Sequence, residues 1–299
     1  MAADFETGLK DWVATRLHDA QLQALEPRPW SEARLYRVES RGVLYALKVH
    51  QHELGFFQEV GAYERWLGTD CEVVTADLVT TCVEHHALLL SWVDGLEGDD
   101  ETLDVHTRCW GIKRAGELAR TLAKIAKPDV DKVDLADAMK RRLRGWSGRA
   151  RGRIPDHWIE WVNATMDCSA FSGVSRIPAH RDLQPRNWIH RNEDIVFLDW
   201  GHARYDAPMT DLVKLVCGAA RHCPGGYEAL LAGYGGAWSA QQCLRLRALC
   251  SLHGLSTATW AAQHGDGATK EQGIDILRWL KELGLTGFCD LISAESSFV

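Results

Sequence analysis

The stretch that decides the fold reads HRDLQPRN over residues 180–187 and is followed by IVFLDWG over residues 195–201. The first part has the pattern H-x-D-x-x-x-x-N, and the second is a short apolar run that ends in D-x-G. Taken singly, Asp182 and Asn187 have an ordinary interpretation as turn residues, and Asp199 as the end of a strand. The ordered set, with an apolar strand between its halves, favours one shared chemical role.

Two acids and an amide at this spacing suit the transfer of a phosphoryl group from Mg-ATP to a hydroxyl. That reaction needs charge neutralisation and in-line positioning more than covalent help from the protein. Asp182 is the expected catalytic residue, which accepts a hydrogen bond from the acceptor hydroxyl and takes its proton late in the reaction. Asn187 and Asp199 are the expected metal ligands, because Mg²⁺ prefers a few hard oxygen ligands when substrate phosphates complete its shell. His180 is expected to brace the loop backbone.

On these motifs the chain resembles the aminoglycoside phosphotransferase and choline kinase family, distant relatives of protein kinases. That family commonly reads H-G-D-L-x-x-x-N, whereas here Arg181 replaces the glycine and Arg186 precedes the asparagine. The resemblance covers nearly the whole chain and implies a bilobal, protein-kinase-like α+β fold. Residues 1–92 are then a small N-terminal lobe with an antiparallel nucleotide-binding sheet and one helix. Residues 93–299 form a larger, mainly helical C-terminal lobe with the catalytic loop, metal site and acceptor pocket, and ATP binds between the lobes.

A kinase also needs a lysine on a strand for the phosphates and an acid on a helix to hold it. The β-prone run VLYALKV over residues 43–49 contains Lys48, whose other interpretation is an edge-strand lysine that deters aggregation. Residues 56–67 have the apolar spacing of a helix, and Glu59 lies at the edge of its apolar face. A carboxylate there requires a cation, and Lys48 is the expected partner. Glu64 is the competing acid, and a solvated Glu59 is the remaining alternative.

Further nucleotide contacts follow from the resemblance. No G-x-G-x-x-G precedes Lys48. Relatives often use a serine-bearing loop instead, which assigns Ser31 and nearby backbone N–H groups to the phosphates, although a serine before a strand is common. The apolar run LLLSWVDG over residues 88–95 resembles the hinge between the lobes. Backbone groups near Ser91 and Val93 are expected to meet the adenine.

Composition limits the class of protein. The chain has 299 residues and a net charge of −7, which argues against nucleic acid as the main partner. No apolar run is long enough to span a bilayer, and the first residues lack the pattern of a signal peptide. Nine cysteines are dispersed without a C-x-x-C pair, which is typical of reduced thiols. We therefore predict a cytoplasmic protein that binds neither membrane nor nucleic acid.

The acceptor is the least determined part of the function. The resemblance implies a magnesium-dependent kinase that uses ATP or GTP to phosphorylate a hydroxyl of a small molecule. The first choice of acceptor is an antibiotic-like natural product, as in antibiotic resistance enzymes. The alternatives are a metabolite kinase of choline, homoserine or sugar type, and a nucleotide-binding module without catalysis. The sequence leaves the acceptor and the oligomeric state open.

Several features bear on this choice. Acids in the last helices, such as Glu271, Asp275 or Glu282, would favour an aminocyclitol, and an aromatic cage would favour an ammonium compound. Residues 140–153 are strongly basic. We interpret them as a solvated helix end and loop, and the alternative is a patch for an anionic acceptor or nucleic acid. Asp211 resembles the acid with which the family braces the catalytic loop.

Overall fold

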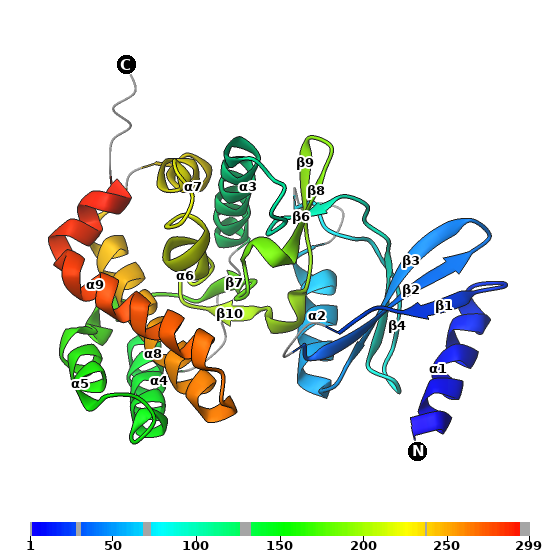
Figure 1. Cartoon of the computed structure of the whole chain (residues 1–299), viewed down its shortest axis with the longest axis horizontal. Helices are drawn as coiled ribbons and strands as arrows, with labels where there is room; N and C mark the ends of the chain where they lie inside the picture. The colour runs from blue at the N-terminus through cyan, green and yellow to red at the C-terminus, as the bar shows by residue number, and fades with distance from the viewer. Residues whose placement is uncertain (1, 28–30, 68–72, 126–132, 237, 294–299) are drawn as a thin grey trace. The chain divides into compact units, whose positions relative to one another are not determined.

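The protein folds into two compact units (Figure 1). The first comprises residues 1–100 and 186–204, and the second comprises residues 101–185 and 205–299. The computed structural model describes residues 2–27, 31–67, 73–125, 133–236 and 238–293. The predicted α+β fold is confirmed, because a five-stranded antiparallel sheet occupies the first unit and helices dominate the second.

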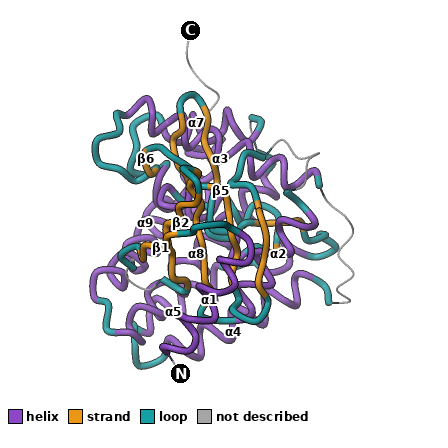
Figure 2. The backbone as a smooth tube through the Cα atoms, turned by 90° about the vertical axis from the view of Figure 1, so that its right-hand side faces the viewer, coloured by secondary structure: helices purple, strands orange, loops and turns teal. Residues whose placement is uncertain are grey.

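In its described residues, the first unit contains two sheets and two long helices. Its elements are α1 (Ala2–Arg16), β1 (Gln21–Ala24), β2 (Ala33–Ser40), β3 (Val43–His50), α2 (Glu53–Arg65), β4 (Leu78–Cys82), β5 (Ala87–Ser91), β6 (Leu96–Glu97), β8 (Trp188–Arg191), β9 (Asp194–Phe197) and the 3₁₀ turn η3 (Trp200–His202). The larger sheet has the strand order β1-β2-β3-β5-β4 with antiparallel neighbours throughout. Figure 2 shows its strands running side by side.

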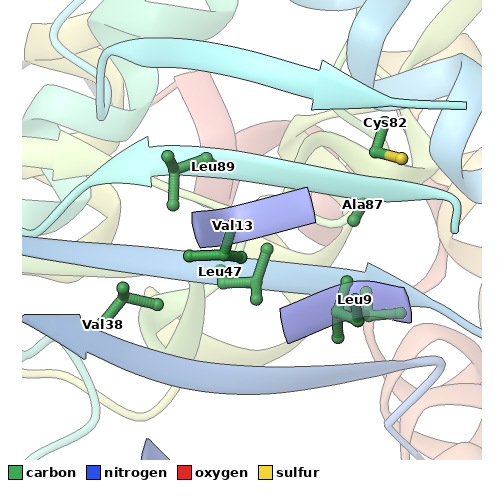
Figure 3. Close-up of a cluster of buried hydrophobic side chains, with 8 residues drawn as sticks. Leu9, Val13, Val38, Leu47, Cys82, Ala87 and Leu89 are labelled. Carbon is green, nitrogen blue, oxygen red and sulfur yellow. The ribbon is translucent and has the colours of Figure 1, made fainter. Parts of the chain in front are cut away.

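Alternation along β3 separates two faces of this sheet. Successive side chains of a strand point to opposite sides, so Leu47 and Val49 share one face and Lys48 points to the other. On the first face, Leu47 packs with Leu9 and Val13 of α1 in a buried apolar cluster (Figure 3). Val49 belongs to the same cluster. Each such side chain contributes about 1.5–3 kcal/mol by burial. The helix α1 therefore seals one face, and α2 covers the face to which Lys48 points (Figure 1).

A second sheet joins to the first unit a segment that is distant in sequence. The strands β6, β8 and β9 pair in that order, and this pairing holds residues 93–100 and 186–204 together. The sequence placed both segments in the C-terminal lobe by their position along the chain. At Gly95, φ is +145° and a Cβ would lie 2.1 Å from the carbonyl oxygen of His190. Only glycine fits this close approach between the two segments.

The second unit is mainly helical. Its elements are α3 (Val105–Lys124), α4 (Leu135–Ala150), α5 (Asp156–Thr165), η1 (Cys168–Phe171), β7 (Ile177–Ala179), β10 (Arg204–Asp206), α6 (Leu212–Lys214), the π-helical turn η4 (Leu215–Ala219), α7 (Gly226–Tyr234), α8 (Ala240–His264) and α9 (Gly267–Ser293). The 3₁₀ turn η2 (Pro185–Asn187) crosses from this unit into the first. Helices α8 and α9 pack together, as do α3 and α7.

The ends of these helices follow ordinary capping chemistry. Asp104 begins α3 by accepting a hydrogen bond from the Thr107 N–H at 2.7 Å. Ser239 and Gln242 form a capping box at the start of α8, which ends at Gly265 in a left-handed conformation. Within the described ranges, no helix combines the length and the apolar composition needed to cross a membrane.

Candidate active site

The first unit gathers a buried ion-pair cluster around Lys48. Its Nζ lies 2.6 Å from Oε2 of Glu59 on α2 and 2.6 Å from Oδ1 of Asp199. The side chains of Lys48 and Glu59 are 7% and 1% exposed, whereas that of Asp199 is 44% exposed. The competing acid Glu64 lies on the exposed side of the helix. The structure therefore brings together the lysine, the helix acid and the D-x-G acid that the sequence singled out.

Electrostatics keeps this cluster ionised. Burial disfavours the charged form of Lys48, but Asp199 and Glu59 outweigh it and raise the pKa of the ammonium above its ordinary value. Burial likewise opposes ionisation of Glu59, but the Lys48 ammonium and a hydrogen bond from His50 hold the pKa of the carboxyl below its ordinary value. A fixed ammonium is thus available beside the exposed carboxylate of Asp199.

His50 is a member of this cluster that our sequence reasoning missed. Its Nε2 lies 2.7 Å from Oε2 of Glu59, and the residue is 7% exposed. His50 follows Lys48 by two positions on β3 and so shares its face of the sheet, which is the signal that could have found it. The other oxygen of Glu59 accepts a hydrogen bond from the Trp200 N–H at 3.3 Å. Glu59 is thereby fixed from β3 and from the segment after β9.

The glycine of the D-x-G motif makes room for this histidine. A Cβ at Gly201 would lie 2.9 Å from Cε1 of His50 and 3.4 Å from Oδ1 of Asp199. Such a contact is too short for a carbon pair, so a side chain at this position would displace the cluster. Asp199 itself adopts a left-handed backbone conformation, with φ of 62°. That conformation is uncommon for a residue other than glycine and is a mark of functional sites.

Asn187 and Asp199 are brought near each other by the pairing of β8 with β9. The Leu198 N–H donates to the carbonyl oxygen of Asn187 at 2.8 Å, which continues the strand register by one pair. An amide oxygen and a carboxylate are a hard donor set that suits Mg²⁺ when phosphate oxygens supply further ligands. Among the described residues, no group of three or more His, Cys, Asp or Glu side chains is arranged to hold a metal.

The expected nucleotide contacts at Ser31, Ser91 and Val93 are less defined. The Ser31 hydroxyl is engaged in its own turn, where it donates to the carbonyl of Ala33 at 2.6 Å. The Ser91 N–H and Oγ both bond the backbone of Asp77, at 2.9 and 2.8 Å. Val93 is buried at 9% exposure and follows the end of β5. The geometry therefore leaves the roles of all three as predictions.

The second unit holds the catalytic loop on a buried carboxylate. Asp211 accepts hydrogen bonds from the backbone N–H groups of His180 and Arg181 at 2.9 and 2.6 Å. His180 is fully buried, and its Nδ1 faces the Asp182 N–H at 3.3 Å. Burial raises the pKa of Asp211 above its ordinary value, against the effect of these donors and of His180. The bracing roles expected for His180 and Asp211 agree with this geometry.

Asp182 is buried and oriented by two side chains. Its Oδ1 accepts a hydrogen bond from Nε2 of Gln184 at 2.6 Å and pairs with Nζ of Lys214 on α6. The charges of Lys214 and Asp182 also act on His253 of α8. Burial, reinforced by Lys214, lowers the pKa of His253 to about 3, so the imidazole is neutral at physiological pH. Our sequence reasoning did not identify Lys214 or His253.

The contacts of Arg181 show how an arginine is accommodated where the family commonly has glycine. Its φ is 67°, a left-handed conformation in which glycine is the residue without steric cost. The arginine instead forms an ion pair with the fully buried Asp206, with Nε 2.7 Å from Oδ2. Arg142 of α4 lies 2.7 Å from the same oxygen. The side chain thus ties the catalytic loop to β10 and α4, which offsets the strained backbone.

In the basic stretch of residues 140–153, one cationic side chain points inward and several others are exposed. Arg142 points inward to Asp206, and Trp146 is stacked by Arg149 with 3.9 Å from the guanidinium carbon to the ring centroid. The remaining exposed cations are Lys140, Arg141, Arg144, Arg151 and Arg153. This arrangement agrees with the solvated helix surface that we favoured.

The acidic residues of the last helices do not gather into a site for a cationic acceptor. Asp275 is paired with Arg221 at 2.6 Å, while Glu271 and Glu282 are exposed on α9. Trp238 is buried against Tyr234 with ring centroids 5.6 Å apart. These contacts do not identify an acidic site for a polycation.

The strand lysine with its helix acid, the D-x-G carboxylate and the braced H-R-D loop define a kinase-like phosphotransferase. A family model described as the phosphotransferase enzyme family matches residues 6–249, so the chain belongs to this family. The resemblance that the sequence indicated is thereby confirmed, and the protein is an ATP-dependent small-molecule kinase. No sequence relative matches among curated proteins.

Solved structures share the fold at low sequence identity. Choline kinase LicA from Streptococcus pneumoniae superposes with a TM-score of 0.66 at 14% identity, covering 92% of this chain and 99% of that one. Macrolide 2'-phosphotransferase MphH from Brachybacterium faecium gives 0.64 at 17% identity, with 92% and 98% covered. A thermostable mutant of aminoglycoside phosphotransferase APH(4)-Ia, in ternary complex with ADP and hygromycin B, gives 0.59 at 14% identity, with 97% and 99% covered.

Proposed function

We propose that this kinase transfers the γ-phosphate of ATP to a hydroxyl of an antibiotic-like natural product in the cytoplasm. The observation that carries the phosphotransfer is the buried cluster in which Lys48 contacts both Glu59 and Asp199 at 2.6 Å. A lysine held between a helix acid and a D-x-G acid is the phosphate site of kinases. The natural-product acceptor is supported by similarity to structures whose ligands or names include hygromycin B and macrolides.

Each residue has a specific task in this reaction. Lys48 neutralises phosphate charge, and Glu59 with His50 holds the ammonium in place. Asn187 and Asp199 would hold Mg²⁺, which supplies charge neutralisation at the phosphate oxygens. Asp182 accepts the hydrogen bond of the acceptor hydroxyl, orients it for in-line attack and receives its proton. Gln184 and Lys214 fix the carboxylate in the orientation that this requires.

A metabolite kinase for a neutral or anionic acceptor is the second candidate. Lys214 pairs with Asp182, so any acceptor hydroxyl that reaches this carboxylate meets a cation at once. An acceptor with an ammonium group next to the reacting hydroxyl would meet this cation beside the carboxylate, so the ion pair offers it little net attraction. Sugars carry no charge and do not depend on such an attraction. This observation weighs against a polycationic aminocyclitol that presents an amine beside its hydroxyl.

The experiment is ADP release from Mg-ATP across a panel of hydroxylated acceptors, with Asp182→Asn as the blank. The panel contains aminoglycosides, macrolides, nucleoside and peptide antibiotics, choline, homoserine, sugars and sugar acids, and is repeated with GTP. We expect one chemical class to stimulate release in the native enzyme and none to do so in Asp182→Asn. Chelation of Mg²⁺ should abolish the release.

Measurements of nucleotide binding distinguish the role of Asp199 as a metal ligand from the role of Asp182 as the base. Asp182→Asn should bind Mg-ATP about as tightly as the native enzyme, because the carboxylate acts on the acceptor. Asp199→Ala should lose both turnover and metal-dependent binding. Normal turnover by Asp182→Asn would refute the assignment of the base. Tight Mg-ATP binding with no turnover on any acceptor would instead support a nucleotide-binding module.

A further inference from the structure

Two thiols that are distant in sequence lie side by side in the second unit. The Sγ atoms of Cys109 on α3 and Cys223 in the turn before α7 are 3.6 Å apart, although 114 residues separate them. Both side chains are partly exposed. The sequence predicted dispersed, reduced thiols, so this juxtaposition is a product of the fold.

The turn around Cys223 surrounds the thiol of Cys109. The Cys109 thiol lies 3.2 Å from the carbonyl oxygen of Pro224, and a Cβ at Gly225 would be in ordinary contact with the same sulfur at 3.6 Å. Gly225 has a φ of +76°, and both it and Pro224 are exposed. A disulfide requires sulfurs about 2.05 Å apart. A shift of the exposed turn by about 1.5 Å would bring the two sulfurs to that distance.

We propose that Cys109 and Cys223 form a reversible dithiol–disulfide site that reacts with oxidised low-molecular-weight disulfides. The thiolate of Cys223, in the exposed turn, attacks one sulfur of a compound such as glutathione disulfide and expels one glutathione thiolate. The thiolate of Cys109 then attacks the Cys223 sulfur of the mixed disulfide and expels the second. The protein pair loses two protons and two electrons, and the low-molecular-weight disulfide gains both as two thiols.

The chemistry of Cys109 is consistent with its role as the second nucleophile. Burial, with Cys223 next, raises the pKa of the Cys109 thiol to about 11. A thiol of this kind attacks slowly in free encounter but efficiently once a mixed disulfide lies 3.6 Å away. The rate of closure should therefore increase between pH 7 and pH 9.

The cross-link would join α3 to the start of α7 and close a loop that contains the whole catalytic loop. Residues 180–187, which carry Asp182, lie inside the closed segment, as does Asp211. A link across so long a loop restricts the unfolded chain strongly. The oxidised protein should therefore unfold at a temperature several degrees higher than the reduced protein.

Two other thiol pairs provide an internal comparison. Cys250 contacts Cys217, and both are buried; Cys289 is partly exposed, but the Cys243 thiol that it contacts is buried. A thiol that solvent reaches poorly reacts slowly with an external disulfide. The site formed by Cys109 and Cys223 should therefore close before either of these pairs.

The test treats the reduced full-length protein with glutathione disulfide at pH 8 and follows it by intact mass and by thiol titration in denaturant. We expect a loss of 2 Da, a fall in the thiol count from nine to seven, and a peptide that links residue 109 to residue 223. Dithiothreitol should restore both the mass and the lower unfolding temperature. Cys109→Ser and Cys223→Ser should each prevent the loss of 2 Da, whereas Cys168→Ser, which changes a thiol outside the three pairs, should not.

The outcomes of this test support or refute the disulfide without any measurement of catalytic activity. An unchanged mass of the folded native protein would overturn the proposal, as would a first disulfide that maps to another pair. A linked peptide without any rise in unfolding temperature would refute the stabilisation. Because the linked peptide is mapped in the native sequence, a serine variant that fails to fold leaves this test intact.

Discussion

Lys214 Nζ forms an ion pair with Oδ1 of Asp182, the carboxylate that the H-R-D motif presents. The same oxygen accepts a hydrogen bond from Gln184, so the base is fixed by one charged and one neutral donor. Lys214 is 28% exposed along its side chain, whereas Asp182 is 5% exposed. The lysine therefore extends from the buried carboxylate toward solvent.

Replacing Lys214 by methionine should lower kcat by roughly ten- to a hundredfold, because a charge-assisted hydrogen bond of about 1.5–3 kcal/mol positions the base. Lys214→Arg, which keeps the cation, should recover most of the rate. Steady-state kinetics with the best acceptor of the panel measures both, and Lys140→Met on the exposed surface of α4 is the control. If Lys214→Met equals Lys140→Met in kcat, the lysine does not position Asp182.

His50→Ala should weaken binding of Mg-ATP by about fivefold or more, because Glu59 loses a charged hydrogen bond worth about 1.5–3 kcal/mol and holds Lys48 less firmly. His52 lies two positions further on and is exposed, so His52→Ala is the matched control. Titration calorimetry of both variants with Mg-ATP provides the measurement. Equal affinities for the two variants would show that Glu59 needs no support from His50.

Arg142→Ala should destabilise the fold by about 2 kcal/mol near pH 7, because it leaves the buried Asp206 with Arg181 as its remaining cation. Burial opposes ionisation of Asp206, but Arg142 and Arg181 outweigh it and hold the pKa of the carboxyl below its ordinary value. A depressed carboxyl pKa stabilises the fold above the pKa of the unfolded chain, which is about 4. That contribution disappears as the pH falls through the lower, folded-state pKa.

The destabilisation by Arg142→Ala should therefore be largest at neutral pH and shrink below about pH 4, where Asp206 is protonated in the unfolded chain. Urea unfolding of the native protein and the variant from pH 3 to pH 8 measures this difference. Arg141→Ala, which changes the exposed neighbour on α4, is the control. A difference that stays constant with pH would mean that Arg142 contributes by packing rather than by charge.

The sequence predicted the parts of the site that depend on local pattern. A β-prone apolar run placed Lys48 on a strand, and helical spacing placed Glu59 at the edge of an apolar face, so their pairing could be inferred. His50 lies two positions after Lys48 on the same strand, but a histidine on a strand has no pattern of its own that demands a carboxylate. Lys214 stands 32 residues after Asp182. Only the path of the chain through β10 and into α6 brings the two together.

The division of the chain could not be read from sequence order either. Residues 186–204 begin within the catalytic loop, yet they belong to the first unit because β8 pairs with β6 and β9 adjoins residues 74–75. Such pairing depends on register between distant segments, which no local propensity specifies. Arg181 likewise reads as an ordinary arginine until its left-handed φ and its contact with Asp206 are known.

Gly233→Ala tests how closely α3 and α7 must pack. A Cβ at Gly233 would lie 2.0 Å from the carbonyl oxygen of Lys113, and one at Gly116 would lie 2.8 Å from that of Leu230, so glycines on both helices permit the contact. Backbone atoms cannot move aside as a flexible side chain does. The substitution should therefore destabilise the fold by about 2–3 kcal/mol, despite the higher helix propensity of alanine.

Gly148 provides the matched control, because it lies in α4 and a Cβ there would meet nothing within 4 Å. Gly148→Ala should stabilise the fold by about 0.5–1 kcal/mol through helix propensity alone. Urea unfolding of the two variants should therefore give changes of opposite sign from the same chemical substitution. If Gly233→Ala also stabilised the protein, α3 and α7 would have room to separate, and the close approach of their backbones would not be required for folding.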